Sequence, residues 1–232
     1  MTIVAAAGDN GRVSDDRLYV PHFNVMPESE VRDFVAAVGT AQLVTVGADG
    51  LPDATFLPVL WRDGVLVAHF ARANAHWRRI EDDAPGLVVV TGPDAYVSPS
   101  FYATKAEHGR VVPTWNYSMV HLRGPVRVID DVGWLRELVG ELTDTHEQTR
   151  QAPWAVEDAP SAYVEKQLRA IVGVELVVES VEAKAKLSQN RSAEDRAGVI
   201  AGLATGHAGE RAVAEQMADQ PTSGLRVRSS GK

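Results

Sequence analysis

Hydrophobic and polar residues alternate with a period of two along several short stretches of this chain, and turn-forming residues separate the stretches. Three of them follow one another, at 41–46, 54–61 and 65–70. The connections Gly47-Ala48-Asp49-Gly50 and Arg62-Asp63-Gly64 are rich in glycine and aspartate, which indicates antiparallel hairpins. Further extended runs lie at 86–91, 95–98, 118–129 and 171–181. We therefore expect an antiparallel sheet of about six strands.

Helical periodicity occurs only at the edges of this strand pattern. The first helix is predicted from an i, i+3, i+4, i+7 series that begins after Pro27 and stops at Gly39; its members are Val31, Phe34, Val35 and Val38. Other helices are predicted at about 75–82, 132–146 and 162–170, and after the cap residue Ser192. Hairpin-ordered strands with peripheral helices predict an α+β fold built on a closed antiparallel barrel.

The 232 residues suffice for one domain with a core of ordinary depth. Residues 1–17 and 204–232 are small, polar and aperiodic, so we expect them to be disordered tails. The folded domain is predicted to span 18–203, without a low-complexity linker or a fixed repeat.

Charge and composition narrow the classes of function. The net charge is −8 and no stretch forms a basic stripe, so direct nucleic-acid binding is not expected. The chain has no cysteine, which excludes thiolate chemistry and leaves redox activity to a cofactor. The N-terminal residues do not resemble a signal peptide and no apolar run is long enough for a membrane helix, so the expected location is the cytoplasm.

The segment AYVSPSFYATKAEHGRVVPTWNY, at 95–117, is the densest in hydroxyl and aromatic side chains. A loop of this length inside a compact domain is usually functional or disordered. Disorder is disfavoured because Phe101, Tyr102, Trp115 and Tyr117 would expose much apolar surface. The alternative is an Ω-loop whose aromatic rings serve only the core.

A second segment, HFARANAHWRRI at 69–80, suits an anion. Asn74 as the N-cap of a helix would present free backbone N–H groups beside Arg72, which together would form a phosphate cradle. The alternative is a solvated basic helix face. In a third segment, at 185–203, Lys186 and Arg191 precede a helix, and a simple cap followed by a solvated tail is the alternative there.

The seven histidines form no metal-binding spacing, and the motifs of P-loop, dinucleotide-binding and serine-hydrolase proteins are absent from the sequence. His69 differs from the others because it ends a strand beside the predicted cradle. It could ligate heme iron or donate a hydrogen bond to a flavin, and a satisfied buried histidine is the alternative.

The sequence closely resembles the PaiB-like family of FMN-binding negative transcriptional regulators over residues 18–203. The segments that carry the resemblance are LYVPHFNV (18–25), ATFLPVLW (54–61), HFARANAHW (69–77), YVSPSFYATKAEHGRVVPTWNY (96–117) and KLSQNRSAEDRAGVIAGL (186–203). That family is similar in fold to the pyridoxamine-phosphate-oxidase-type split barrels, which bind FMN at a two-fold dimer interface. The resemblance therefore implies a cytoplasmic homodimer with an antiparallel six-stranded split β-barrel.

The resemblance also implies roles for particular residues. Those implied in cofactor binding are Thr55, Phe56 and Leu57 at the isoalloxazine, Arg72 and Asn74 at the phosphate, His69 and Trp77 beside them, Thr114, Trp115 and Asn116 from the other subunit, and Arg191 as the closing residue. Ala75 and Phe56 stand where the family usually has proline and histidine, which bears more on the ring contacts than on the phosphate contacts.

Three functions fit this resemblance: a flavin-dependent oxidoreductase acting on a small molecule, a cofactor-sensing regulator without catalysis, and a heme enzyme. The heme-enzyme possibility comes from a sister branch that resembles this family. That branch contains piperazate synthases, which bind heme b and form an N–N bond. Members of that branch tend to lack the K-x-E-H-G stretch present here as Lys105 to Gly109. Its presence favours the regulator-like branch, while His69 keeps heme as the alternative cofactor.

Overall fold

The computed structural model describes residues 2–3 and 17–220, and its strands form one sheet. Hydrogen-bonded neighbours follow the order β3-β2-β6-β7-β8-β5-β4, while β9 pairs with β7 and with β1. The strand bounds are β1 Thr2–Ile3, β2 Thr40–Val46, β3 Pro52–Pro58, β4 Leu60–Arg62, β5 Val65–Ala71, β6 Ala84–Val97, β7 Thr114–Ile129, β8 Ile171–Val177 and β9 Ser180–Lys186. The α+β class and the antiparallel main sheet are thus confirmed.

The six-stranded closed barrel is corrected to a sheet of nine strands whose row does not close through hydrogen bonds. Two predicted strands are each divided in two. The stretch 54–61 bends after Pro58, which has no N–H group to donate, and 171–181 breaks at Val178 and Glu179. The row ends, β3 and β4, are separated by Val59 alone, so the sheet curls back on itself as an incomplete barrel.

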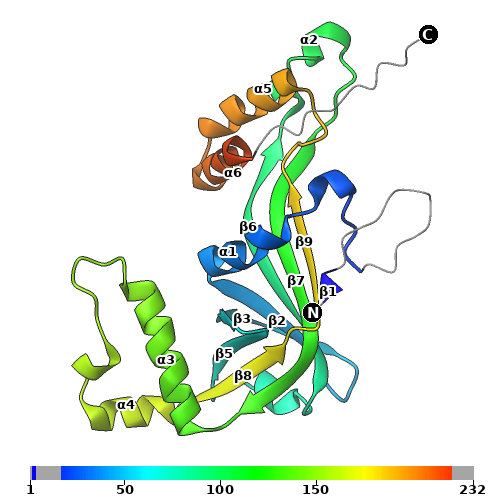
Figure 1. Cartoon of the computed structure of the whole chain (residues 1–232). Helices are drawn as coiled ribbons and strands as arrows, with labels where there is room; N and C mark the ends of the chain where they lie inside the picture. Colours follow the sequence, from blue (N-terminus) through cyan, green and yellow to red (C-terminus); the bar gives the residue numbers. More distant parts are fainter. Residues whose placement is uncertain (1, 4–16, 221–232) are drawn as a thin grey trace.

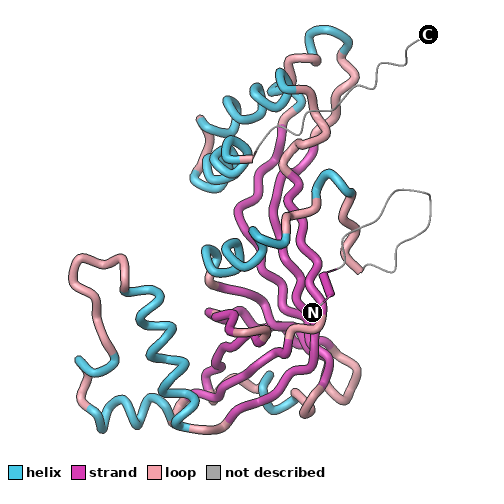
Figure 2. Tube along the Cα trace, in the orientation of Figure 1, coloured by secondary structure: helices cyan, strands magenta, loops and turns pink. Residues whose placement is uncertain are grey.

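Two long strands, β6 and β7, run from the barrel body into a projecting arm (Figures 1 and 2). They stay paired from Ala84↔Val126 to Val97↔Thr114, with a register shift between Thr91 and Asp94. The predicted strands at 86–91 and 95–98 are therefore one bent strand. The loop predicted at 95–117 is shortened, because 95–97 and 114–117 belong to this hairpin.

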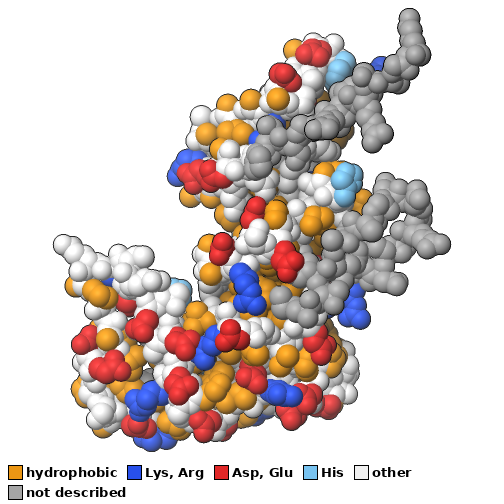
Figure 3. All heavy atoms as spheres, in the orientation of Figure 1, with side chains coloured by type: hydrophobic (Ala, Val, Ile, Leu, Met, Phe, Trp, Pro, Cys, Tyr) orange, Lys and Arg blue, Asp and Glu red, His pale blue; other side chains and the backbone are white. Residues whose placement is uncertain are grey.

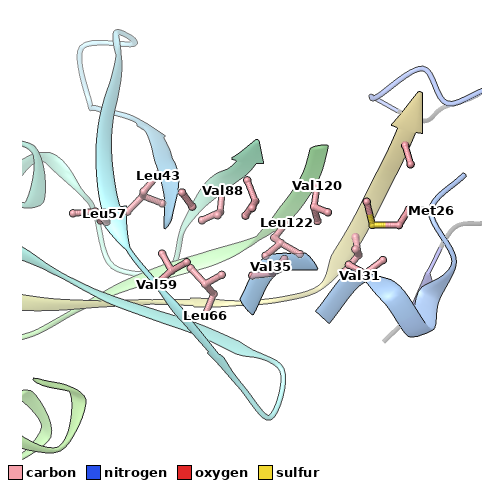
Figure 4. Packing of buried hydrophobic residues seen from close by; sticks show 14 of the residues in the cluster. Met26, Val31, Val35, Leu43, Leu57, Val59, Leu66, Val88, Val120 and Leu122 are labelled. Atoms are coloured by element: carbon pink, nitrogen blue, oxygen red, sulfur yellow. The ribbon is translucent and has the colours of Figure 1, made fainter. Parts of the chain in front are cut away.

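The main core lies between the curled sheet and helix α1 (Glu28–Val38), as predicted from the helix periodicity. Val31 and Val35 of α1 are buried against the sheet. On the sheet side the core contains Leu43, Val88 and Leu122, each from a different strand (Figure 4). The helix begins after Pro27 and ends at Gly39 in the left-handed conformation, which glycine adopts without steric cost.

The arm carries two helices at the end of the described chain, and this corrects the prediction of a disordered tail from residue 204. Helix α5 spans Ala193–Ala204 and helix α6 spans Ala208–Asp219. In α6, Val213, Ala214 and Met217 are buried. Small alanines dilute the apolar stripe of α6, so its periodicity is weak in the sequence. Residues 1, 4–16 and 221–232 of the predicted tails lie outside the described residues.

Helices α3 (Val132–Glu147) and α4 (Ser161–Leu168) form a separate projection beside the barrel (Figure 1). They have a small core of their own, which contains Leu135, Val156, Val164 and Leu168. Acidic and basic side chains are interspersed over the body on the face shown in Figure 3. Across residues 2–3 and 17–220, no helix is long and apolar enough to cross a membrane.

Candidate functional site

A buried histidine joins two of the predicted cofactor residues at one end of the barrel. His76 begins the short 3₁₀ helix η2 (His76–Arg79) and is only 4% exposed. Its Nδ1 lies 2.8 Å from Thr55 Oγ1 on β3, and its Nε2 lies 2.9 Å from Thr45 Oγ1 on β2. Asn74 accepts a bond from the His76 N–H at 2.9 Å and donates to Thr55 Oγ1 at 3.3 Å. Thr55 and Asn74 are therefore fixed in position by His76.

The His76 ring is held in an apolar environment. It packs edge-on against Phe70, with ring centroids 5.2 Å apart. Desolvation lowers the pKa of His76, and the nearby Arg79 charge adds to this effect while Asp53 opposes it. The neutral ring can be a donor at one nitrogen and an acceptor at the other. It thus orients two threonine hydroxyls, one of which is on the open strand.

Strand β3 is the open edge beside this network. It pairs with β2 on one side, and the strand row ends there. The side chain of Phe56 is 66% exposed on β3, whereas Leu57 is buried in the core. The predicted ring contact at Phe56 is open to a ligand, whereas the half-buried Thr55 side chain lies on the other face of the strand, bonded to His76 and Asn74. At Leu57 only the backbone is available, because alternate residues of a strand face opposite sides.

Arg72 has a different set of partners from the one predicted. Its guanidinium forms two contacts with the Asp130 carboxylate, after the end of β7, one of them at 3.0 Å. It also donates to the carbonyls of Arg169 at 2.8 Å and Ile171 at 3.0 Å. This ion pair lowers the pKa of Asp130 and raises that of Arg72. Arg72 thus ties the end of β5 to the start of β8.

The helix predicted at 75–82 is shorter, and this weakens the predicted phosphate cradle. The four residues of η2 form one 3₁₀ turn, whose N-cap is Ala75 rather than Asn74. A turn of this length has almost no dipole to offer an anion. Trp77 lies within the turn, donates from Nε1 to the Arg72 carbonyl at 3.0 Å, and has the Arg78 guanidinium 4.5 Å from its ring centroid.

His69 lies on the opposite face of β5 from this network. Ala68 and Phe70 point into the main core, so the alternation of a strand turns His69 toward the α3 side, with Val67. It pairs with Gly173, whose Cα lies against the Trp134 ring. Its buried Nδ1 has no hydrogen-bond partner among the described residues, and burial lowers its pKa.

The other predicted residues lie on the arm. Trp115 is 51% exposed, and its ring meets that of Tyr96 edge to face, with centroids 6.2 Å apart. Thr114 Oγ1 accepts a hydrogen bond from Lys186. Asn116 is fully buried and donates to Ser188 Oγ at 3.0 Å and to Met217 Sδ at 3.3 Å. Asn116 therefore supports the packing of α6, and Trp115 is the accessible member of the three.

Cationic side chains gather next to Trp115. Lys184 and Lys186 lie on one face of β9, with their ammonium nitrogens 5.3 and 5.9 Å from the centroid of the Tyr117 ring. The Arg191 guanidinium lies 4.6 Å from the Tyr102 ring centroid. We call Lys184, Lys186 and Arg191 the arm cations. Sequence analysis singled out Lys186 and Arg191 but missed Lys184 and His76. The available signal for Lys184 was its position two residues before Lys186 in a strand, and for His76 its position two residues after Asn74 in the segment HFARANAHW.

The predicted site residues thus form two groups. Thr55, Phe56, Asn74 and Trp77 lie at the end of the barrel, while Thr114, Trp115 and Arg191 lie on the arm. No hydrogen bond or ion pair between described residues joins the barrel-end set to the arm set. A ligand in contact with both sets would have to reach from one part of the molecule, or from one subunit, to another.

The fold and the sequence segments together define a class of protein. The curled antiparallel sheet, with an exposed aromatic edge strand and a helix-bearing arm, is of the split-barrel type found among flavin and heme proteins. A family model described as "Putative FMN-binding domain" matches residues 18–180. The chain belongs to this FMN-binding-domain family, of the PaiB-like type, which confirms the resemblance of its segments.

Relatives of known sequence agree with this assignment. The chain is 34% identical over 191 residues to "Protease synthase and sporulation protein PAI 2" of Bacillus subtilis, an alignment covering 79% of this chain and 87% of that protein. It is 38% identical over 167 residues to the uncharacterized protein AN0679 of Emericella nidulans, covering 61% and 66%.

Solved structures share the fold at low sequence identity. A conserved hypothetical protein of Mycobacterium tuberculosis superimposes with a TM-score of 0.55 at 17% identity, covering 75% of this chain and 94% of that one. The FAD and heme binding protein of Mycobacterium smegmatis gives a TM-score of 0.54 at 21% identity, covering 78% and 79%. These likenesses establish the architecture of the sheet.

Proposed function

We propose that this protein is a homodimeric FMN-binding protein that holds each flavin between the barrel end of one subunit and the arm of its partner. One observation carries the proposal: the barrel-end residues Thr55 and Asn74 are fixed by a buried histidine next to the exposed Phe56, yet the arm residues of the same chain do not complete the site. A second subunit would supply them.

The chemistry of the barrel end suits the ring system of a flavin. Isoalloxazine is flat and apolar on its faces, and it has hydrogen-bonding groups along one edge. The Phe56 side chain offers an apolar surface on one face of β3, the edge of β3 that pairs with no described strand offers backbone donors and acceptors, and the Thr55 and Asn74 side chains offer polar groups on the other face. Bound there, FMN would supply hydride or electron transfer, and these residues would orient its ring.

For the phosphate we keep Arg72 as the proposed cation, with Asn74 beside it. The guanidinium has to exchange Asp130 for the phosphate or bind both, since its present bonds go to Asp130 and two carbonyls. Arg78 is the nearby alternative; it is exposed and lies over Trp77. Replacing each arginine by alanine separately and comparing FMN with riboflavin identifies the phosphate ligand.

A function in small-molecule redox chemistry or sensing is favoured over direct DNA contact. The net charge of −8 opposes binding to a polyanion. Any regulatory role would therefore act through the level of a small molecule or through another protein. Loss of the flavin colour when a reductant such as NADH or NADPH is added would identify catalysis, and a flavin spectrum that no reductant changes would identify a sensor.

Heme b with His69 as the ligand remains the alternative cofactor. The buried, unpartnered Nδ1 of His69 is compatible with ligation. However, His69 faces α3, so a ligand bound to it would not contact the Thr55 network on the far side of β5. The absorption spectrum of the freshly purified protein separates the two cofactors, and a heme spectrum altered by His69→Ala would overturn the flavin proposal.

A further inference from the structure

The arm cations are three positive side chains that gather without a carboxylate partner in the part of the chain that the structure describes. None of the ion pairs among the described residues includes Lys184, Lys186 or Arg191. Some arginines of the chain are paired, for example Arg123 with Glu182 and Arg127 with Asp83, whereas the arm cations are three unpaired charges close to one another. Like charges that are kept together without a counterion raise the free energy of the folded state. Such an arrangement is typical of a site that an anion completes.

The three side chains are held in place by contacts that leave donors free. Lys186 donates to Thr114 Oγ1 and to the Trp115 carbonyl at 2.7 Å, so one of its three N–H groups has no partner among the described residues. The Arg191 side chain donates to no described residue and rests on the Tyr102 ring at 4.6 Å. Stacking on the ring fixes the plane of the guanidinium.

Lys184 adds a third, buried positive charge next to Lys186. It is 7% exposed, donates to the Tyr19 carbonyl at 2.9 Å and lies near the Tyr19 and Tyr117 rings. Its neighbour on the same face of β9, Glu182, is already occupied by Arg123 and by the N–H groups of Arg17 and Leu18. Burial lowers the pKa of Lys186; Tyr117 opposes this shift, and the charges of Lys184 and Arg191 add to it. The repulsion that an anion would relieve is therefore present.

We propose that Lys186 and Arg191, backed by Lys184, form a subsite for the phosphate or carboxylate group of a small molecule other than the flavin. The inference rests on the proposed function in that the exposed Trp115 and Tyr96 beside this subsite would face the flavin of the partner subunit. The reacting molecule is accordingly an anion, which the arm binds by its charged group.

The test uses inorganic phosphate as the probe on the full-length protein, with and without saturating FMN, at constant ionic strength. Calorimetry should show phosphate binding to the FMN-loaded wild type, with an affinity lowered by about tenfold or more in Lys186→Met and largely retained in Lys186→Arg. Arg127→Met removes a positive charge on the barrel body and is the matched control; it should bind phosphate like the wild type.

Three outcomes overturn the proposal. Equal phosphate affinity in Lys186→Met and the wild type means that the arm cations do not bind the anion. Phosphate binding only without FMN, together with a loss of FMN but not riboflavin affinity in Lys186→Met, means that they hold the cofactor phosphate. Absence of binding means that they are not an anion site. If the protein takes up no flavin at all, the proposed function fails, while phosphate binding to the arm is still measured on its own.

Discussion

Arg72 and Asp130 face each other through two nitrogen–oxygen contacts, and this pair links the end of β5 to the residue that follows β7. Arg72 is also the residue proposed to contact the FMN phosphate. A carboxylate and a phosphate compete for the same two-pronged guanidinium surface. The Asp130 side chain is more than half exposed, so an exchange of partners needs no core rearrangement.

Asp130→Asn should raise the affinity for FMN severalfold and leave riboflavin affinity unchanged, because the freed guanidinium meets less competition for the phosphate. Arg72→Ala should lower FMN affinity by about tenfold or more, again without an effect on riboflavin. Fluorescence titration with both flavins measures this. Parallel losses for FMN and riboflavin in Arg72→Ala would show that Arg72 acts through the fold.

His76 makes folding stability dependent on pH. Its pKa is lowered in the folded state from an ordinary value of 6.5, so the unfolded chain binds more protons between the two pKa values. The stabilisation from neutral His76 is complete above about pH 6.5 and is lost as the pH falls through the folded pKa. His69 and His121 shift in the same direction. Denaturant unfolding between pH 7.5 and pH 5 should therefore show falling stability.

His76→Phe should flatten part of this dependence and lower stability at neutral pH by about 1–3 kcal/mol, because the buried Thr45 hydroxyl loses its partner. The Thr55 side chain would also lose its anchor, so flavin affinity should fall. His146→Phe is the control, since His146 lies in the separate cleft between α1 and α3. An unchanged pH profile in His76→Phe would contradict the assignment.

Trp115 lies exposed on the arm and is expected in the dimer interface. Trp115→Glu should shift the protein toward monomer and weaken flavin binding, because a charge would have to be buried between the subunits. Sedimentation at micromolar concentration measures the assembly. Trp154→Glu changes a residue of similar exposure, 47%, on the α3–α4 projection and should leave the dimer intact. A wild-type protein that sediments as a monomer would refute the shared site.

Gly198 of α5 packs directly on the backbone at Phe101, which follows the end of β6. A Cβ at this position would lie 2.1 Å from the Phe101 carbonyl oxygen. Gly198→Ala should therefore destabilise the protein by about 1–3 kcal/mol, although alanine favours helices. Gly140→Ala in α3, where a Cβ meets no atom within 4 Å, should instead stabilise it by about 0.5–1 kcal/mol. Thermal unfolding of both variants checks the pair, and equal effects would contradict the contact.

The sequence pattern was sufficient to predict most of the strands but not where they break. Alternation identified the run 171–181, yet nothing local marks the step at Val178, where the chain passes from the β8 register to the β9 register along β7. Helix α6 was missed because only Val213, Ala214 and Met217 are buried and alanines on its other sides reduce the hydrophobic contrast. Both features depend on contacts that are distant in sequence.

The candidate site was predictable as a set of segments and not as a geometry. The resemblance picked out Thr55 and Asn74, which the structure brings together. It could not show that Asn116 is buried under Met217 or that Arg72 is paired with Asp130, because these partners lie far along the chain. Side-chain roles therefore required the fold.

The bend in β6 between Thr91 and Asp94 lies where β6, β7 and β9 together connect the body to the arm. A bulge of this kind fixes a kink and increases the local twist of the strand. Since β6 and β7 continue through the bend as paired strands, the bend contributes to the direction in which the arm leaves the body. Removing a residue here should change the direction of the part of the arm beyond the bend, which carries Trp115, relative to the barrel. The angle between the two halves of a shared pocket is thus encoded in a few residues that need never contact the ligand.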